Sequence, residues 1–320
     1  MVCAFMNADV ADVVIIGAGI SGLAAARTLV DNGLRPKVID KGRGVGGRMA
    51  TRRIGGARLD HGAQFFTTRS PEFTTLIEEA VSAGAVTEWC RGFGPEPDGY
   101  PRWRGTEGMT SLAKWMGRDL DIEVGRTIAD LREVPARSYV LTAPVPQTLA
   151  VLSFSGLLPE PELAIALASV AYKPTIAVML VLSAPPTGLP DHGGEQFVDD
   201  QYLAFITDNQ VKGISDIPAV TIHLSNDHSS YLWESSDAEV VEAALTHAID
   251  RVGLLGDAEI IDHQVQRWRY AGPVEVWPEP TVTFGSSPFV ALAGEAFAGP
   301  KVEGAFRSGQ AAAHAIMAAL

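Results

Sequence analysis

The chain has few of the residues and segments on which several classes of protein depend. Its 320 residues include two cysteines, Cys3 and Cys90, too few for a disulfide framework or a cysteine metal site. This scarcity is typical of the reducing cytoplasm, where we expect the protein to be. No uninterrupted apolar run reaches the roughly 18 residues of a membrane span, so no membrane partner is expected. Residues 1–9 lack the pattern of a secretion signal, and a short disordered leader is predicted over residues 1–11.

Positive charge and metal-ligand spacing are also scarce. The chain carries 25 Lys and Arg against 38 Asp and Glu, and the net charge of −13 argues against nucleic acid as a partner. Any phosphate group must therefore be bound by local arginines and backbone amides. Four of the seven histidines have no ligand spacing, and we interpret them as structural or surface groups: His223, His228, His247 and His263. No metal site is predicted.

The chain does contain a complete strand, glycine loop, helix and second strand near its start. Val13–Ile16 is an apolar β-branched run, typical of a buried parallel strand. Gly17, Gly19 and Gly22 follow it and fit the pattern G-x-G-x-x-G. The first glycine permits a tight turn, the second lets a pyrophosphate approach the backbone, and the third lets the helix pack close to the strand.

A helix is predicted over Ser21–Val30, directly after Ile20, so the amides of these first residues would face the phosphates. Val38 and Ile39 form a second strand, and Asp40 ends it. Asp40 lies roughly 20 residues after the glycines, where an acid that binds the ribose is expected. The stretch therefore predicts a dinucleotide site. The alternative is a tight turn in an α/β protein that binds no ligand.

The next loop combines glycines with cations. Lys41, Arg43, Gly47 and Arg48 lie in the sequence Lys-Gly-Arg-Gly-Val-Gly-Gly-Arg, which exposes backbone amides and adds guanidinium groups suited to phosphate. A flexible basic surface loop is the alternative interpretation. The loop resembles the R-x-G-G-R element of FAD-dependent amine oxidases and their relatives, where it contacts the flavin side of the cofactor. The resemblance favours FAD over NAD.

Two further segments resemble the renalases, a flavoprotein branch of that superfamily. Leu59–Thr67 contains Asp60-His61-Gly62-Ala63-Gln64, similar to their D-x-G-A-Q segment, and Trp103–Met109 fits W-x-G-x-x-G-M. The resemblance implies that Gly62 and Ala63 lie under the flavin and that Gln64 offers an amide near its polar edge. A strand end with an incidental Asp-His pair is the alternative for the first segment. A strand over Ile122–Ile128 and the stretch Val140–Gln147 come next, and we assign Ile128 and Ala143 as cofactor contacts.

The middle of the chain has neither a phosphate loop nor a nucleophile elbow. Helices are predicted over Pro71–Ala83, 110–116, Leu163–Val170 and Asp237–Val252, and a loop over Trp89–Pro101. A break at Ala171–Pro174 precedes strands over Ile176–Leu182, Phe197–Ile206, Val220–Leu224 and Ile260–Tyr270. Renalases usually carry a β-meander between the segments that end at 128 and begin at 140. Only residues 129–139 stand there in this chain, so the meander must be absent or reduced to a turn.

The C-terminal stretch resembles the G-D … V-E-G-A-x-x-S-G terminus of the same proteins. Gly294 and Glu295 follow a strand, with Glu in place of the usual Asp, and a helix begins near Lys301. The resemblance implies that Val302, Glu303 and Ala305 contact the flavin near N1. A helix N-terminus and a cation there would stabilise the negative charge that reduction adds. An ordinary Ala-rich helix and a solvated lysine are the alternatives.

The predicted fold class is α/β: a Rossmann-like (GR2-type) FAD-binding domain with an inserted α+β substrate domain on a mainly antiparallel sheet. The FAD-binding domain takes residues 8–70, 103–150 and 281–320, and the substrate domain 71–102 and 151–280. The cofactor is expected to be non-covalent, since no cysteine lies in the cofactor segments. We expect a monomer or homodimer.

The resemblance implies oxidation of a small dihydronicotinamide-type substrate by hydride transfer to flavin N5, with O2 as electron acceptor and hydrogen peroxide as product. His61, Gln64 and Lys301 are the polar candidates for catalysis. A flavin amine oxidase or desaturase is the first alternative, and Trp268, Tyr270 and Trp277 could supply the aromatic cage of an amine oxidase or simply pack in the core. A non-catalytic FAD-binding protein is the second alternative.

Overall fold

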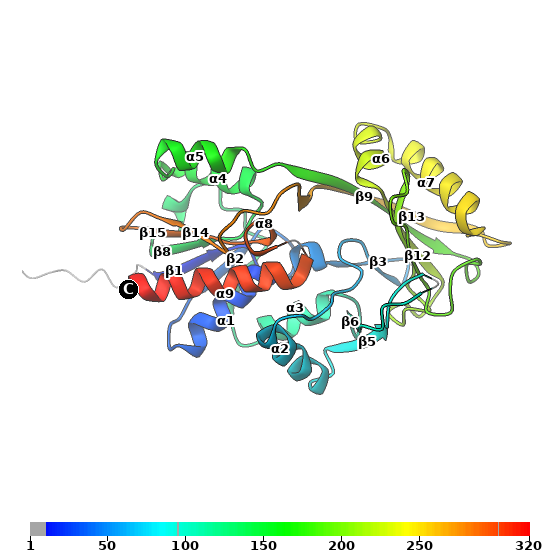
Figure 1. Ribbon diagram of the computed structural model, residues 1–320, viewed down its shortest axis with the longest axis horizontal. Helices are drawn as coiled ribbons and strands as arrows, with labels where there is room; N and C mark the ends of the chain where they lie inside the picture. Colours follow the sequence, from blue (N-terminus) through cyan, green and yellow to red (C-terminus); the bar gives the residue numbers. More distant parts are fainter. Residues whose placement is uncertain (1–10, 95, 300) are drawn as a thin grey trace, which may run out of the picture.

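A computed structural model of the chain describes residues 11–94, 96–299 and 301–320. Two sheets dominate it, one mainly parallel and one antiparallel, and the antiparallel sheet lies at the end of the molecule away from the C-terminus (Figure 1). The predicted α/β class, with a Rossmann-like half and an antiparallel half, is confirmed. The leader predicted over residues 1–11 lies outside the described residues except for Ala11, which begins the first strand.

The first sheet has six strands in the order β14-β15-β8-β1-β2-β7, and all neighbours are parallel except β14 and β15. The strands are β1 Ala11–Ile16, β2 Lys37–Asp40, β7 Asp121–Val124, β8 Ala136–Leu141, β14 Val282–Phe284 and β15 Phe289–Leu292. Side chains alternate between the two faces, so Val13 and Ile15 pack into one core and Val14 into another. The glycine loop after β1 opens at the carboxyl end of the sheet, where folds of this kind bind ligands.

Four helices lie on one side of this sheet, and two of them, α1 and α9, contact its strands. They are α1 Ile20–Asp31, α2 Pro71–Ser82, α3 Thr110–Gly117 and α9 Lys301–Ala319, and they share one core. The long helix α9 runs alongside α1 (Figure 1). The two backbones approach closely at Gly309, where a Cβ would overlap the carbonyl oxygen of Ser21. This contact places the middle of α9 beside the first turn of α1, directly after the glycine loop.

The opposite face is covered by α4 Val145–Ser155, α5 Pro161–Ala168 and the short α8 Glu295–Ala298. Helix α4 was not predicted from the sequence. A single 3-10 turn, Leu131–Glu133, connects the region of β7 to β8. The expectation that no meander stands between 128 and 140 is therefore confirmed.

The second sheet is antiparallel throughout, in the order β10-β11-β12-β9-β13. Its strands are β9 Tyr172–Leu182, β10 Gly194–Gln196, β11 Leu203–Asp208, β12 Ala219–Leu224 and β13 Ile260–Pro273. Helices α6 Asn226–Tyr231 and α7 Asp237–Val252 lie on one side. Leu180 faces α7, whereas its neighbours Met179 and Val181 face a hairpin from the first half of the chain.

That hairpin, β3 Thr51–Ile54 and β4 Ala57–Asp60, joins the two halves of the molecule. Its Ile54, Ala57 and Leu59 form a small core with the second sheet. A second hairpin, β5 Val86–Cys90 and β6 Arg102–Gly105, flanks it. Because β4 ends between the two sheets, the D-x-G-A-Q segment that follows it lies where the two halves meet.

Two sequence predictions about the second sheet are wrong. Most of the break expected at Ala171–Pro174 is part of β9, which begins at Tyr172. Pro174 lies opposite a bulge of β13, so its missing amide costs no hydrogen bond between the strands. Of the single strand expected over Phe197–Ile206, only the part from Leu203 onward is strand, in β11; β10 ends at Gln196, and the residues between the two strands form a turn. Asp199 has φ +56° and the Asp200 carboxylate accepts from the two amides that follow the turn, which ends the first strand.

Other predicted elements match within a few residues, and α7 matches at both ends. The predicted division into two domains stays a prediction; Phe73 and Ile77, assigned to the substrate domain, pack in the same core as α1 and α9. Among the described residues, no helix combines the length and apolar character needed to cross a membrane. In the same ranges, no three His, Cys, Asp or Glu side chains gather as a metal site would require.

Candidate functional site

The glycine loop has the geometry of a phosphate-binding turn. Gly17 has φ +112°, and its amide donates to the Ile39 carbonyl at 2.8 Å, so the chain turns sharply out of β1. Gly19 then precedes α1, and Ile20, Ser21 and Gly22 form its buried first turn. A Cβ on Gly22 would overlap the carbonyl oxygen of Gly17, which explains the third glycine of the pattern. The free amides of this turn therefore point out of the sheet edge, as an anion site requires.

Asp40 closes the other side of this turn. Its Oδ2 accepts from the Ala18 amide and its Oδ1 from the Gly42 amide, both at 2.6 Å. A carboxylate has further lone pairs, so these bonds fix its orientation and leave acceptor capacity for two ribose hydroxyls. The predicted position of Asp40 at the end of β2, beside the glycine loop, is confirmed.

The R-x-G-G-R-like loop packs directly on the glycine loop. The Gly46 amide donates to the Ala18 carbonyl at 2.8 Å, and Gly19 and Gly46 form an isolated parallel bridge. A short 3-10 helix, Gly47–Met49, follows and carries Arg48 inward. Arg43, by contrast, is exposed, and Lys41 reaches only the Gln147 side chain at 3.3 Å. The structure therefore brings Gly47 and Arg48 to the site and leaves the two outer cations at its edge.

Arg48 connects segments far apart in the sequence. Its guanidinium forms a bidentate ion pair with Glu295 and donates to the Tyr270 carbonyl at 2.8 Å. Its own carbonyl accepts from the Ala63 amide at 2.9 Å, and a Cβ at Gly62 would overlap that same carbonyl oxygen. The loop after β2, the segment after β4 and the start of α8 thus meet at one arginine. The Glu295 carboxylate is almost fully buried, and this pairing explains how it remains there.

His61 presents a stacked aromatic surface at the same place. Its ring lies parallel to that of Trp268, with centroids 5.4 Å apart and 6° between the planes, and its carbonyl accepts from Trp268 Nε1 at 2.7 Å. The same carbonyl contacts His223 Nε2 at 3.3 Å, so neutral His223 carries its proton on Nε2. This stack fixes the orientation of His61.

Burial keeps both histidines neutral. It lowers the pKa of His61 to about 3, helped by the charge of Arg52, and lowers the pKa of His223 to about 4. The Nδ1 atoms of both rings are buried and have no hydrogen-bond partner among the described residues. At neutral pH, His61 therefore carries no positive charge, and its buried ring supports the partly exposed ring of Trp268.

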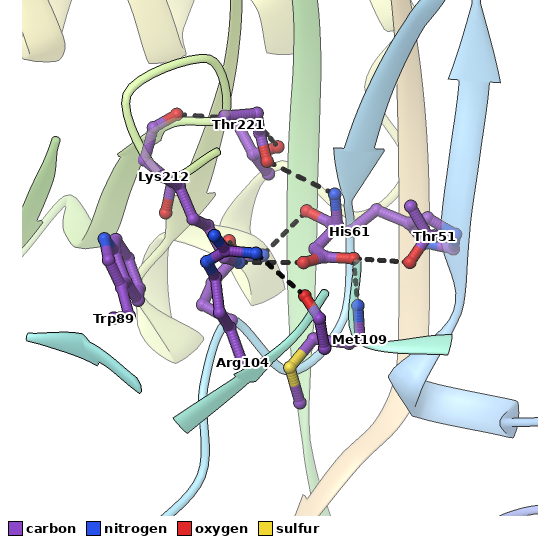
Figure 2. Close-up of polar contacts among 12 residues, drawn as sticks. Thr51, His61, Trp89, Arg104, Met109, Lys212 and Thr221 are labelled. Atoms are coloured by element: carbon purple, nitrogen blue, oxygen red, sulfur yellow. Dashed lines mark hydrogen bonds and ion pairs between the residues drawn. The ribbon is translucent and has the colours of Figure 1, made fainter. Parts of the chain in front are cut away.

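Asp60, one residue earlier, is the centre of a buried polar cluster, whose members Thr51, Met109 and Lys212 are labelled in Figure 2. Its Oδ1 accepts from Thr51 Oγ1 at 2.5 Å and from the Met109 amide at 2.9 Å, and its Oδ2 pairs with Lys212 Nζ at 2.8 Å. Met109 belongs to the W-x-G-x-x-G-M segment, so the two renalase-like segments meet at this carboxylate. Phe66 and Trp103 also pair through backbone hydrogen bonds of 3.0 and 2.8 Å.

Gln64 takes part in this cluster rather than projecting from it. Its Nε2 donates to the Asp60 carbonyl at 2.7 Å and contacts the Gly62 carbonyl at 3.3 Å, and its Oε1 accepts from Lys212 Nζ at 3.3 Å. Both ends of the side-chain amide are thus engaged within the protein. The prediction that this amide faces a cofactor edge stays untested, and the contacts assign it a structural task.

The C-terminal segment supplies the last wall. The Gly294 amide donates to Ser308 Oγ at 2.9 Å, and Val302 and Ala305 are buried in the first turns of α9. The Glu303 carboxylate points toward the start of α2, where it accepts from the Arg69 and Ser70 amides at 2.9 and 2.6 Å. Lys301 is exposed at the start of α9, with φ +79°.

Two predicted contacts lie on the far side of the glycine loop. Ala143 follows β8 and is half-buried, and its carbonyl accepts from Thr148 Oγ1 at 3.0 Å. Ile128 is buried in the same core as Ile39. Two residues before it, the Arg126 amide donates to the Asp40 carbonyl at 3.1 Å. Ala143 thus follows β8 on one side of β1, and Ile128 lies with β2 on the other.

One unpartnered polar atom fits a dinucleotide at this site. Ser21 Oγ is buried in the first turn of α1 and has no hydrogen-bond partner among the described residues. A buried hydroxyl is normally hydrogen-bonded, and a phosphate oxygen at the helix N-terminus would be an acceptor for it. The amides of the glycine loop and the Ser21 hydroxyl can donate to the diphosphate of FAD, and the Asp40 carboxylate can accept from its ribose. The site therefore fits FAD.

Sequence reasoning missed two features of the site. Lys212 lies in the stretch Asp-Asn-Gln-Val-Lys-Gly, which carries no recognisable motif and gives no signal of burial. The partners of the aromatic candidates were also not foreseen: Trp268 stacks on His61, Tyr270 packs edge-on against Tyr172, and Trp277 packs against Phe297. Each of the three therefore has a different aromatic partner.

Known proteins resemble the chain at two levels. A family of NAD(P)-binding Rossmann-like domains matches residues 15–80. Putrescine oxidase of Kocuria rosea is 41% identical over 68 residues, 21% of this chain and 14% of that protein. The flavin-containing amine oxidase of Danio rerio is 54% identical over 46 residues, 14% of this chain and 9% of that protein. The chain thus matches only a small part of the length of these relatives.

The fold, in contrast, is shared over nearly the whole chain. The solved structure of wild-type putrescine oxidase bound to putrescine superimposes with a TM-score of 0.72 at 17% identity, covering 96% of this chain and 99% of that one. This likeness establishes the fold: a Rossmann-like half and an antiparallel half arranged as in that oxidase. A shared fold does not define a reaction, which must be argued from the site.

Proposed function

We propose that the protein is an FAD-dependent oxidoreductase of the flavin amine oxidase superfamily. Three segments that each resemble a flavin-contacting segment meet at Arg48, and this observation carries the proposal. They are the loop after β2, the turn at Gly62 and Ala63, and Glu295 at the start of α8. The short sequence relatives bear names of flavin or amine oxidases, which supports the same assignment.

The residues of this chain then have distinct tasks. The amides at the start of α1 and Ser21 Oγ bind the diphosphate, and Asp40 accepts from the ribose. Gly62 and Ala63 let the backbone approach the ring system, and the start of α9 lies beside its polar edge. The bound flavin would accept a hydride at N5 from the substrate and pass the electrons to O2. Trp268 is partly exposed and stacks on the buried His61 ring, so it gives the substrate a flat surface against which to stack.

For the substrate, we propose a dihydronicotinamide-type ring, as the renalase-like segments imply. Such a ring is electron-rich, and its oxidation gives an aromatic cation without the help of a general base. The site is consistent with that chemistry, because His61 is neutral, Gln64 is engaged within the protein, and the His61–Trp268 stack suits a planar ring. We expect this reaction to take place in the cytoplasm, with the protein as a monomer or homodimer.

A flavin amine oxidase is the second candidate, because both short sequence relatives carry amine-oxidase names. An amine would be held between aromatic rings in front of the flavin. The aromatic candidates of this chain each pack against a different partner, which supports the dihydronicotinamide more than the amine.

Anaerobic reduction of the FAD-loaded protein distinguishes these candidates. A panel of dihydronicotinamide isomers and amines is mixed with it, and flavin bleaching at about 450 nm is followed in a stopped-flow instrument. The proposal predicts fast bleaching by at least one dihydronicotinamide and reoxidation by air with formation of hydrogen peroxide. Bleaching by amines alone would assign the second candidate, and bleaching by neither would favour a protein that holds FAD without catalysis.

A further inference from the structure

Lys212 is a charged side chain in an unusually enclosed position. Both Lys212 and its partner Asp60 are 0% exposed, and the ion pair joins the loop between β11 and β12 to the end of β4 (Figure 2). Lys212 Nζ also lies 4.9 Å from the centroid of the Trp89 ring, a cation–π contact on another side. The ammonium is therefore surrounded by Asp60, Gln64 and Trp89.

The fold alone does not require such a pair. Two charges lose their hydration on burial, and apolar residues of similar size often stabilise a core as well or better. Burial lowers the pKa of Lys212, while the charge of Asp60 acts in the opposite direction. A buried ion pair is thus better explained by the geometry that it imposes than by the stability that it adds.

That geometry concerns the turn after β4. Lys212 Nζ donates to Gln64 Oε1, which leaves Gln64 Nε2 to donate to the carbonyls of Asp60 and Gly62. The two carbonyls bracket His61, so the orientation of one amide fixes the backbone on both sides of it. Reversing that amide would place its NH2 group against the ammonium, a repulsive arrangement.

The loop that carries Lys212 is itself held firmly. The Lys212 amide donates to the Asp208 carbonyl at 2.9 Å, and Asn209 Nδ2 donates to Thr221 Oγ1 at 3.0 Å. Gly213 follows with φ +84°, a conformation that favours glycine, and Arg104 Nη2 packs 2.7 Å from where a Cβ would lie. The second sheet therefore presents Lys212 to the turn from a rigid position.

We propose that Lys212 is a positioning residue: through Asp60 and Gln64 it fixes the turn His61–Ala63, which forms the wall of the candidate flavin site. The inference rests on the proposed function for its consequence, but its structural part concerns residues of this chain alone. Lys212 does not contact the substrate, because its ammonium is enclosed by the cluster. It acts on the flavin through the shape of the turn.

The test compares three variants with the parent. Lys212→Met removes the ammonium and keeps the length of the side chain. The double variant Asp60→Asn/Lys212→Met also removes the carboxylate, so that no unpaired charge remains buried. Lys114→Met makes the same substitution at an exposed position of α3 and is the matched control. For each, the midpoint of thermal unfolding, hydrogen exchange of a peptide covering residues 61–66, and the flavin reduction potential are measured.

We expect Lys212→Met to unfold at a lower temperature and the double variant to regain most of that loss. In both, exchange of the 61–66 peptide should be faster by about tenfold or more, because the turn has lost the bond that orients Gln64. The flavin potential should shift in both, and Lys114→Met should match the parent in every measurement. The persistence of fast exchange after stability has recovered distinguishes positioning from simple stabilisation.

Two results would overturn the proposal. If exchange and potential recover with the unfolding temperature in the double variant, the pair only stabilises the fold. If neither exchange nor potential changes in Lys212→Met, the turn does not depend on Lys212. A parent protein that binds no FAD would instead refute the proposed function, and hydrogen exchange without cofactor would still decide the role of Lys212.

Discussion

The two buried histidines should make the protein sensitive to mild acid. His61 and His223 are neutral in the folded state, with pKa values of about 3 and 4, whereas an unfolded histidine titrates near its ordinary value of 6.5. A group whose folded pKa is depressed contributes stability above its unfolded pKa and loses that contribution as the pH falls toward the folded value. The sensitive range is therefore from about pH 6.5 down to about pH 4.

The size of the effect follows from the same values. Below the unfolded pKa, each histidine costs about 1.4 kcal/mol of stability per pH unit until its folded pKa is reached. Between pH 6.5 and pH 5 this is roughly 2 kcal/mol for each residue, or roughly 4 kcal/mol for both. A typical domain has a free energy of unfolding of about 5–15 kcal/mol, so this loss is a large fraction of the total.

Urea unfolding of the FAD-free protein at pH 7, 6 and 5 measures this loss. The comparison is the double variant His61→Phe/His223→Gln, in which Phe keeps the stack on Trp268 and Gln keeps a donor for the carbonyl of residue 61. Carboxylates titrate in both proteins, so the difference between the two curves isolates the histidines. The variant should lose roughly 4 kcal/mol less than the parent between pH 7 and 5. Equal losses in both proteins would refute the assignment of these histidines as buried and neutral.

Three other predictions concern single residues. Asp40→Ala should weaken FAD binding by roughly 1.5–3 kcal/mol without changing the spectrum of the bound flavin, because a charged acceptor for the ribose is lost. Equal affinity of parent and variant in a fluorescence titration would show that Asp40 does not bind the ribose. Lys301→Met should lower the flavin reduction potential and slow hydride transfer while FAD stays bound, since a cation at the start of α9 stabilises negative charge at N1. A dye-linked potential equal to that of the parent would show that Lys301 is a solvated lysine without effect on the flavin. Gly309→Ala should destabilise the protein by about 1–3 kcal/mol, because the new Cβ overlaps the Ser21 carbonyl and forces α1 and α9 apart. An unchanged midpoint of urea unfolding would contradict the close approach of α1 and α9.

The local patterns of the chain were readable from its sequence. The glycine loop, β2 and Asp40 lie where the motif predicted them, because each depends on residues a few positions apart. Helix α7 was predicted at both ends, and its start has a capping box between Ser236 and Glu239. Such features are determined by near neighbours and need no knowledge of the rest of the fold.

Features that depend on distant partners were not readable. Pro174 signals a break in the sequence, yet the bulge of β13 opposite makes it acceptable inside β9. Arg48 and Glu295 were both assigned to the site, but no local pattern indicates that they pair across 247 positions. Lys212 looks like a surface residue until the fold places Asp60 beside it.

FAD binding is the property on which the proposed function rests. The FAD-free protein is titrated with FAD while quenching of flavin fluorescence is followed, and the loaded protein is then precipitated with acid. The account predicts saturation at one FAD per chain and release of all flavin into the supernatant. Flavin retained in the pellet would indicate a covalent link, for which His61 is the first candidate, and a failure to bind FAD at all would contradict the central claim.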